Sequence, residues 1–354
     1  MRAAGLILQF AVLTLWVIAA TGSATALAQT AAGTLLVVNK AGHSVSLIDL
    51  TTGTVQHELP TGAGPHEIAV SPDGRTAVIS NYGPDDLPGN SLTVIDIAAT
   101  RVVTTLPLGI YRRPHGVAWL PDNRQIVVTA EDNQVLLLID VPTGRIVRAI
   151  PTHGKISHMV AVHPDGQRAY VTSIGSGDLT VIDIPRGRVM AQIPLGKGAE
   201  GIALSPDGSQ VWAACREDDS VTVLDSGTLK VIRKLDTARF PVRVTFSPDG
   251  KTVLITNARA SSVEIIAADS YQRSAELSMR GNFDIGNGAW LGGLLGVSTL
   301  PIGTLIHPAG KLAFVANTYG GFVAVIDLEH RRITGTILAG KAPDGLGYTA
   351  VIPE

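Results

Sequence analysis

A short motif that ends in Ile-Asp or Leu-Asp after an alternating apolar run occurs seven times along this 354-residue chain, once in a degraded form. The copies end at Asp49, Asp96, Asp140, Asp183, Asp225, Ala267 and Asp327. Successive ends are 42 to 47 residues apart, except for the last interval of 60. This spacing is typical of the four-stranded blades of a propeller. The sequence therefore predicts seven repeated sheets.

One complete repeat predicts four short strands, at residues 65–70, 76–80, 92–96 and 102–106. The first two are joined by Ser71-Pro72-Asp73-Gly74, in which proline pre-sets φ and the aspartate can bond its own backbone. Related corners follow in five further repeats. We therefore expect an all-β fold, a seven-bladed β-propeller with four-stranded antiparallel blades.

The two ends of the chain supply complementary parts of one blade. The first repeat begins at a second strand, over residues 35–39, and lacks an inner strand, whereas residues 343–350 match the inner-strand pattern with no blade after them. We expect three N-terminal strands and this C-terminal strand to form one sheet that closes the ring. Closure would remove the exposed edges that invite aggregation.

The first 28 residues are typical of a secretory signal peptide. Arg2 precedes an apolar stretch over residues 6–20 and the small-residue sequence Ala26-Leu27-Ala28, so cleavage is expected after Ala28. An uncleaved anchor is the alternative, although the apolar stretch is short for a bilayer. We expect residues 29–354 to form one propeller domain, periplasmic or secreted, without a stable membrane span after signal cleavage.

Composition excludes several kinds of site. Cys215 is the only cysteine, so no internal disulfide can form, and its place at the end of a second strand favours a small apolar packing role. The formal net charge is −2 and no Lys/Arg-rich run occurs, so no nucleic-acid partner is expected.

Candidate metal ligands emerge when the inner strands are aligned. The second residue of each is, in chain order, His66, His115, His158, Glu200, Val242, Ile302 and Asp344. Neutral imidazoles with one carboxylate suit Zn, Fe, Mn or Cu. The sequence predicts a candidate metal site at His66, His115, His158 and Glu200, which His153 could join. A structural role, with each histidine bonding a nearby carbonyl, explains the same pattern.

The loops that lead into the inner strands carry a basic residue in six of the seven repeats. The candidate ligand-binding residues among them are Arg112, Arg113, Lys155, Lys197 and Arg239. Clustered at one entrance, these side chains would favour an anionic small molecule or a protein partner. Solvated surface residues are the alternative interpretation.

One of these loops is enlarged. Residues 280–300 account for the 60-residue interval and contain Phe283, Trp290 and several leucines among glycines. Such a composition suits a mobile apolar lid over the channel face, or a packed cap without a ligand.

Three segments, Tyr170-Val171-Thr172, residues 78–81 and residues 254–257, resemble the YVTN-type β-propeller repeat family. The resemblance covers essentially the whole mature chain. It implies a scaffold that surface proteins, binding proteins and some cofactor-dependent enzymes share, several of them exported. A partial resemblance to the haem-binding propellers of bacterial nitrite reductases implies a non-covalent haem, because the chain has no C-x-x-C-H sequence for covalent attachment.

The sequence leaves three functions open. The first is an exported binding or scaffold protein whose His-lined, basic-rimmed channel mouth takes an anionic ligand, a metal or a protein partner. The second is a metal- or haem-dependent enzyme, of hydrolase, lyase or oxidoreductase type, with Glu200 as a ligand or general base. The third is a purely structural propeller. The expected cofactor is a divalent transition metal or a non-covalent haem, and whether the protein is catalytic stays open.

Overall fold

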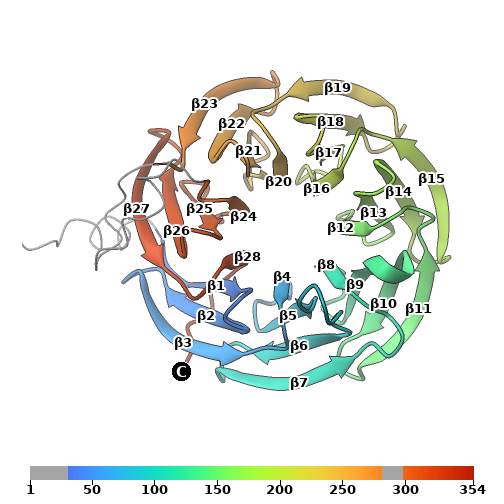
Figure 1. Cartoon of the computed structure of the whole chain (residues 1–354), viewed down its shortest axis with the longest axis horizontal. Helices are drawn as coiled ribbons and strands as arrows, with labels where there is room; N and C mark the ends of the chain where they lie inside the picture. The colour runs from blue at the N-terminus through green and yellow to red at the C-terminus, as the bar shows by residue number, and fades with distance from the viewer. Residues whose placement is uncertain (1–30, 281–297) are drawn as a thin grey trace, which may run out of the picture.

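The computed structural model describes residues 31–280 and 298–354, which form seven four-stranded antiparallel sheets arranged around a central axis (Figure 1). The expected seven-bladed propeller is confirmed. The predicted signal peptide, residues 1–28, and nearly all of the enlarged loop lie outside the described residues. No helix in the described ranges is long and apolar enough to cross a membrane.

Each blade contributes one strand to each of four concentric positions. The inner strands are β4 (Pro65–Val70), β8 (Pro114–Trp119), β12 (Ser157–Val162), β16 (Ala199–Leu204), β20 (Pro241–Phe246), β24 (Pro301–Ile306) and β28 (Pro343–Thr349). The second strands are β1 (Thr34–Asn39), β5 (Thr76–Asn81), β9 (Gln125–Ala130), β13 (Arg168–Ser173), β17 (Gln210–Cys215), β21 (Thr252–Asn257) and β25 (Leu312–Asn317).

The outer half of each blade has the same regularity. The third strands are β2 (Ser44–Asp49), β6 (Ser91–Asp96), β10 (Val135–Asp140), β14 (Asp178–Asp183), β18 (Ser220–Asp225), β22 (Ser262–Ala267) and β26 (Phe322–Asp327). The outer strands are β3 (Thr54–Pro60), β7 (Arg101–Pro107), β11 (Arg145–Pro151), β15 (Arg188–Pro194), β19 (Val231–Asp236), β23 (Gln272–Ser278) and β27 (Arg332–Leu338). One 3₁₀ turn, η1 (Glu131–Asn133), follows β9.

The ring closes as the sequence predicts. β28 pairs with β1, so the C-terminal strand joins the three N-terminal strands in the sheet β28-β1-β2-β3. The Tyr348 hydroxyl donates to the Ala32 carbonyl at 3.0 Å, and the Thr349 hydroxyl donates to the Gly74 carbonyl of the next blade at 2.7 Å. The two ends of the chain are therefore fastened to each other and to a neighbouring sheet.

The core lies between adjacent blades. Leu36 and Leu47 of one blade pack with Ile79 and Ile95 of the next, and none of the four side chains is exposed. Burial of apolar surface, at about 25 cal/mol per Å², is therefore distributed around the whole ring. The outer strands, such as β3, are largely exposed.

A break in strand pairing occurs near the start of every inner strand. In β4, Pro65 pairs with Asn81, but the next pair is Ile68 with Ile79, and the other six inner strands break register at the corresponding place. A bulge re-aims the side chains it contains. The second residue of each inner strand is thereby released from the regular alternation of the sheet.

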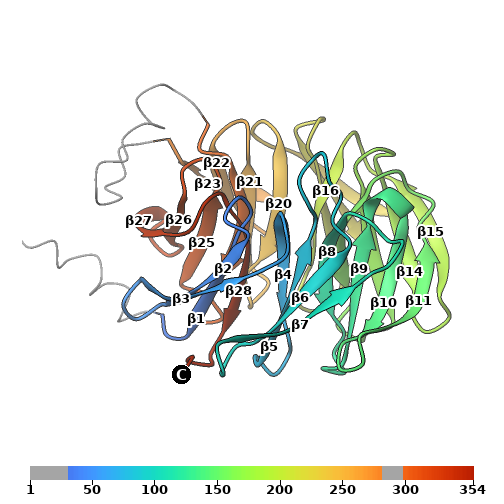
Figure 2. The same ribbon diagram turned by 60° about the horizontal axis from the view of Figure 1, so that its bottom comes forward.

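These bulges lie at one end of the ring, which we call the entry face, where all inner strands begin. In the side view, the C-terminus marks the opposite end, where β28 finishes (Figure 2). The inner strands approach one another closely here. A Cβ atom on Gly116 would lie only 2.8 Å from the carbonyl oxygen of His158 on the next blade, so only glycine fits at this position.

Candidate functional site

The backbone at the entry face repeats the same arrangement in all seven blades. The residue before each inner strand has positive φ, and its carbonyl accepts a hydrogen bond from the residue that follows the second strand. For example, the Glu131 amide donates to Arg113 at 3.1 Å, and the Tyr82 amide donates to Gly64 at 3.0 Å. The residues fixed in this way after the second strands are Lys40, Tyr82, Glu131, Ile174, Arg216, Ala258 and Thr318.

This regular frame carries side chains of very different character around the ring. Polar groups occupy the second position of β28, β4, β8, β12 and β16, whereas β20 and β24 carry Val242 and Ile302 there. Among the residues after the second strands, Ala258 and Thr318 lie on the less polar side, and Ile174, in the blade of β12, is the one apolar residue on the polar side. The candidate site is therefore one-sided, although the fold is nearly symmetric.

The structure brings the three predicted histidines together. The ring centroids of His66 and His115 are 5.2 Å apart, and those of His115 and His158 are 3.7 Å apart. Their residues are only 7%, 3% and 8% exposed, so the rings are packed within the protein. His153, in contrast, is exposed in the loop before β12. The role of these histidines as metal ligands stays a prediction.

Glu131 and Tyr82 belong to the same cluster, although sequence reasoning missed both. The carboxylate of Glu131 forms a short hydrogen bond with Nδ1 of His158, and its other oxygen accepts a bond from the Tyr82 hydroxyl at 2.7 Å. Glu131 is 7% exposed. Alignment of the residues after the second strands would have revealed both side chains. We call His66, His115, His158, Tyr82 and Glu131 the histidine cluster.

Three members of the histidine cluster can supply ligands to one metal ion. One atom each from His115, Glu131 and His158 lies within 4.8 Å of the others, and all three residues are buried. The Nδ1 atom of His115 is buried without a hydrogen-bond partner in the described part of the chain. Two imidazoles and a carboxylate form a donor set that suits first-row transition metals.

Glu200 links the cluster to two arginines. Its Oε1 lies 3.7 Å from His158 Nε2, and its Oε2 accepts a bond from Arg216 at 2.6 Å. Arg243 lies 3.4 Å from the same carboxylate and also pairs with Glu67. Burial opposes ionisation of Glu200, but His158, Arg243 and Arg216 outweigh it and lower its pKa to about 2.

The histidines have different proton affinities because their neighbours differ. Burial disfavours charge on His158, but Glu131 and Glu200 prevail and raise its pKa to about 9. Burial, assisted by Lys40, lowers the pKa of His66 to about 3. Burial and the adjacent His158 and His66 hold the pKa of His115 well below its ordinary value. In the absence of a metal, the cluster therefore combines two neutral imidazoles with one imidazolium.

The predicted basic residues lie further out. Four of them have exposed side chains: Arg112, Lys155, Lys197 and Arg239. The Cζ atom of Arg113 lies 4.7 Å from the centroid of the Tyr82 ring. The cations in direct contact with the site carboxylates are instead Arg216 and Arg243. A ligand-binding role for the exposed residues stays a prediction.

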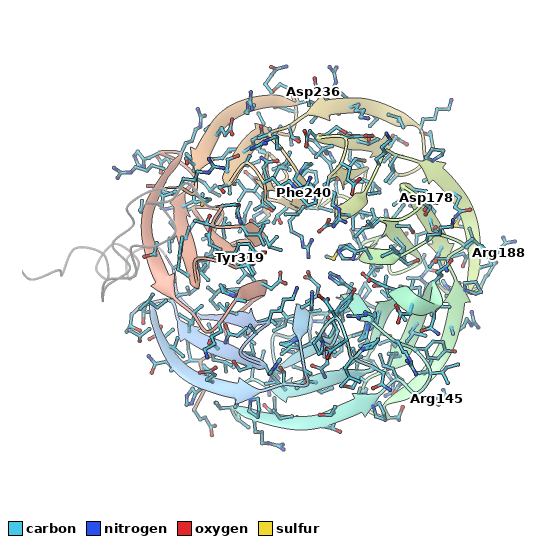
Figure 3. The ribbon with its side chains drawn as sticks, in the orientation of Figure 1. Arg145, Asp178, Arg188, Asp236, Phe240 and Tyr319 are labelled. Atoms are coloured by element: carbon cyan, nitrogen blue, oxygen red, sulfur yellow. The ribbon has the colours of Figure 1, made fainter. Side chains whose placement is uncertain are left out.

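Figure 3 shows Phe240 and Tyr319 on the inner side of the ring and Arg145, Arg188 and Asp236 at its outer edge.

Two family models match adjoining parts of the chain. The model of the cytochrome D1 heme domain matches residues 121–273, and the model of a YNCE-like beta-propeller matches residues 16–122. The chain is a β-propeller. The more specific YVTN-type relationship stays a prediction, and the first match covers His158, Glu200, Arg216 and Arg243 but not His66 or His115. No curated protein matches the sequence.

Solved structures show the same fold at low sequence identity. Hydrazine synthase of Kuenenia stuttgartiensis superposes with a TM-score of 0.70 and 21% identity, over 83% of this chain and 92% of that chain. A functionally unknown protein from Desulfotomaculum acetoxidans DSM 771 gives a TM-score of 0.73 and 15% identity, over 91% and 100%. At these identities the likeness extends to the fold alone.

Proposed function

We propose that this protein is an exported, periplasmic or secreted, binding propeller that holds a divalent transition-metal ion and presents it to an anionic ligand at the entry face. The observation that carries the proposal is the convergence of His115, Glu131 and His158, whose ligand atoms lie within 4.8 Å of one another. Three side chains from β8, η1 and β12 reach one point because the bulges and the loop after β9 aim them there.

The surroundings of these three residues fit a metal site. A ligating carboxylate or imidazole is commonly held by a further hydrogen bond. Glu131 accepts such a bond from Tyr82, and Nε2 of His158 lies 3.7 Å from Glu200. Metal ligation at Nδ1 would satisfy the unpartnered atom of His115 and would require His158 to give up its proton.

Metal content and metal-dependent stability test this proposal. Protein produced with residues 1–28 and purified without a chelator or metal resin should contain about one equivalent of a transition metal. EDTA should lower Tm, because an ion that binds only the folded state stabilises it by about 2.7 kcal/mol at a hundredfold excess over Kd. His115→Ala and Glu131→Gln should lose this response.

His163→Ala is the matched control, because His163 pairs with Asp165 in a turn at the opposite end of the ring. It should retain the metal and the response to EDTA. Metal-free protein with a Tm that is indifferent to EDTA and to added Zn, Mn, Fe or Cu salts would refute the metal site.

A non-covalent haem is the second candidate, because the match to the cytochrome D1 heme domain covers residues 121–273. The His115 and His158 rings are too close for a macrocycle to lie between them. His66 would be the better residue to hold a haem, since its Nδ1 bonds the Gly64 carbonyl at 2.9 Å and leaves Nε2 to bind the iron. A bound haem would supply redox chemistry, and the exposed basic loops could pair with its propionates.

An absorption spectrum distinguishes the two candidates. A Soret band that is lost in His66→Ala and retained in Glu131→Gln would favour haem. Colourless protein that contains a metal ion would favour the His115, Glu131 and His158 site.

A further inference from the structure

Phe240 occupies a strained backbone position at the entry face. It precedes β20 with a φ of 65°, in the left-handed conformation that the residue before the inner strand adopts in every blade, with glycine at Gly64 and Gly198 and a larger residue in the other four. A bulky residue is uncommon in this conformation and persists only where the surroundings fix it. The Phe240 amide donates to Asp219 Oδ1 at 2.8 Å, and its carbonyl accepts from Ala258 at 2.8 Å. The aromatic ring is therefore presented at a set place.

Two guanidinium groups lie against the Phe240 ring. The Cζ atom of Arg259 lies 3.9 Å from the centroid of Phe240, and that of Arg216 lies 5.0 Å from it. Each contact is a cation–π interaction, which holds a cation without using its hydrogen-bond donors. Phe240 thus places two guanidinium groups in one neighbourhood. Arg216 is paired with Glu200, whereas Arg259 forms no ion pair within the described residues, so its positive charge favours an anion that binds beside it.

The hydrogen-bonding capacity of this pair is largely unused. Arg216 binds Glu200, and its buried Nε atom makes no hydrogen bond, although it lies 3.9 Å from a carboxylate oxygen of Glu217. Arg259 is exposed, and within residues 31–280 and 298–354 its guanidinium makes neither an ion pair nor a hydrogen bond. An arginine has five N–H donors in a planar fork that matches a carboxylate.

A second arginine–aromatic pair in the same fold shows the contrast. Arg113 covers Tyr82, but it also donates to the Asp85 carbonyl at 2.7 Å, and the Tyr82 hydroxyl is bound to Glu131. That pair is satisfied by the protein itself. The Phe240 pair has the same aromatic contact, but among the described residues Arg259 has no hydrogen-bond acceptor, which is the difference expected between a structural contact and a ligand site.

We propose that Arg259, Arg216 and Phe240 form a binding site for the carboxylate group of a small organic anion. Arg259 would bind the carboxylate through its paired N–H groups, Phe240 would hold the guanidinium of Arg259 in place, and Arg216, paired with Glu200, would lie beside the bound anion. Arg216 also binds Glu200, which lies 3.7 Å from His158. The anion would thus bind next to the histidine cluster, but the site does not require a metal.

Calorimetric titration of EDTA-treated protein with acetate, succinate and benzoate tests the site at constant ionic strength. At least one of these anions should bind saturably to the wild type. Arg259→Gln should weaken binding by about tenfold or more, because a charge-assisted hydrogen bond is lost. Phe240→Leu should weaken it as well, because the ring that holds the guanidinium is removed.

Arg233→Gln is the matched control, because Arg233 lies over the Tyr271 ring at 5.3 Å, away from the entry face. It should bind like the wild type. Because the titrated protein is treated with EDTA, saturable binding in this experiment separates the proposal from the metal site. The proposal is overturned if the wild type binds none of the three carboxylates, if Arg259→Gln matches Arg233→Gln, or if chloride competes as well as the carboxylates.

Discussion

Arg243 on β20 reaches across the central axis and forms an ion pair with Glu67 on β4, although the two strands belong to blades that are not neighbours. The inner strands β24 and β28 separate them on one side, and β8, β12 and β16 separate them on the other. Both residues occupy the third position of their strands. Arg243 also lies 3.4 Å from Glu200, so one guanidinium joins three blades.

Removal of this guanidinium should strongly destabilise the folded protein. Arg243 is 8% exposed, and the nearby carboxylates raise its pKa against the effect of burial. Arg243→Met would leave Glu67 and Glu200 without this counter-ion, so we expect a loss of about 3–5 kcal/mol in the free energy of unfolding. Urea denaturation at neutral pH measures it.

An exposed ion pair provides the control. The side chain of Arg186 is 71% exposed and pairs with Asp183 at 2.9 Å, so Arg186→Met should cost less than about 1 kcal/mol. The double variant with Arg243→Met and Glu67→Gln should recover part of the loss, because one uncompensated carboxylate is removed. If Arg243→Met and Arg186→Met lowered the free energy of unfolding equally, the ion pair between Arg243 and Glu67 would have no special stabilising role.

The metal-free protein should lose stability as the pH falls below about 6.5. The pKa of His66 is about 3 in the folded protein and near 6.5 when the chain is unfolded, so the unfolded state binds more protons between these values. The contribution of His66 to the free energy of unfolding is fully present above pH 6.5 and decreases by up to about 1.4 kcal/mol per pH unit below it. Between pH 7 and pH 5 the loss from His66 is about 2 kcal/mol.

Denaturation of EDTA-treated variants at pH 7 and pH 5 isolates this contribution. His66→Gln should reduce the difference between the two pH values by about 2 kcal/mol. The same pH difference in wild type and His66→Gln would show that the folded protein does not hold His66 neutral.

The fold could be predicted because its signals are local and repeated. The predicted strand at residues 65–70 has the observed bounds, and the outer strand expected at residues 102–106 extends by one residue at each end. Alternation of apolar residues and the Pro-Asp-Gly corners determine such strands within a few residues of the chain. Repetition then gives the number of blades.

The site could be predicted only where it follows the repeat. Alignment of the inner strands identifies His66, His115 and His158, because the bulge gives the second residue the same place in each blade. Glu131 also holds a repeated place, directly after a second strand, so an alignment of those positions would have identified it. Its bond to His158 of the next blade and the contact of Arg243 with Glu67 across the axis are not marked in the sequence. No periodic pattern indicates which residues face each other across a ring, so these partners require coordinates.

Ring closure predicts a sharp difference between two truncations. A chain that ends at residue 342 lacks β28, which exposes the edge of β1 and the apolar surface that Leu346 and Tyr348 cover. We expect thermal unfolding of this variant, followed by circular dichroism, to lose its cooperative transition. A chain that ends at residue 351 retains β28 and should unfold cooperatively. A cooperative transition near the wild-type Tm in the shorter chain would contradict closure by β28.

The thiol of Cys215 should not react with thiol reagents in the folded protein. Its side chain is fully buried between blades, and burial raises the pKa of the thiol to about 11. Only the thiolate reacts with a disulfide reagent, so both access and ionisation oppose labelling at pH 8. We expect no reaction with dithionitrobenzoate in buffer and one thiol per chain in concentrated guanidinium chloride. Slow labelling at the rate of global unfolding agrees with this packing, whereas rapid labelling of the folded protein would mean that β17 separates from its neighbours without unfolding of the ring.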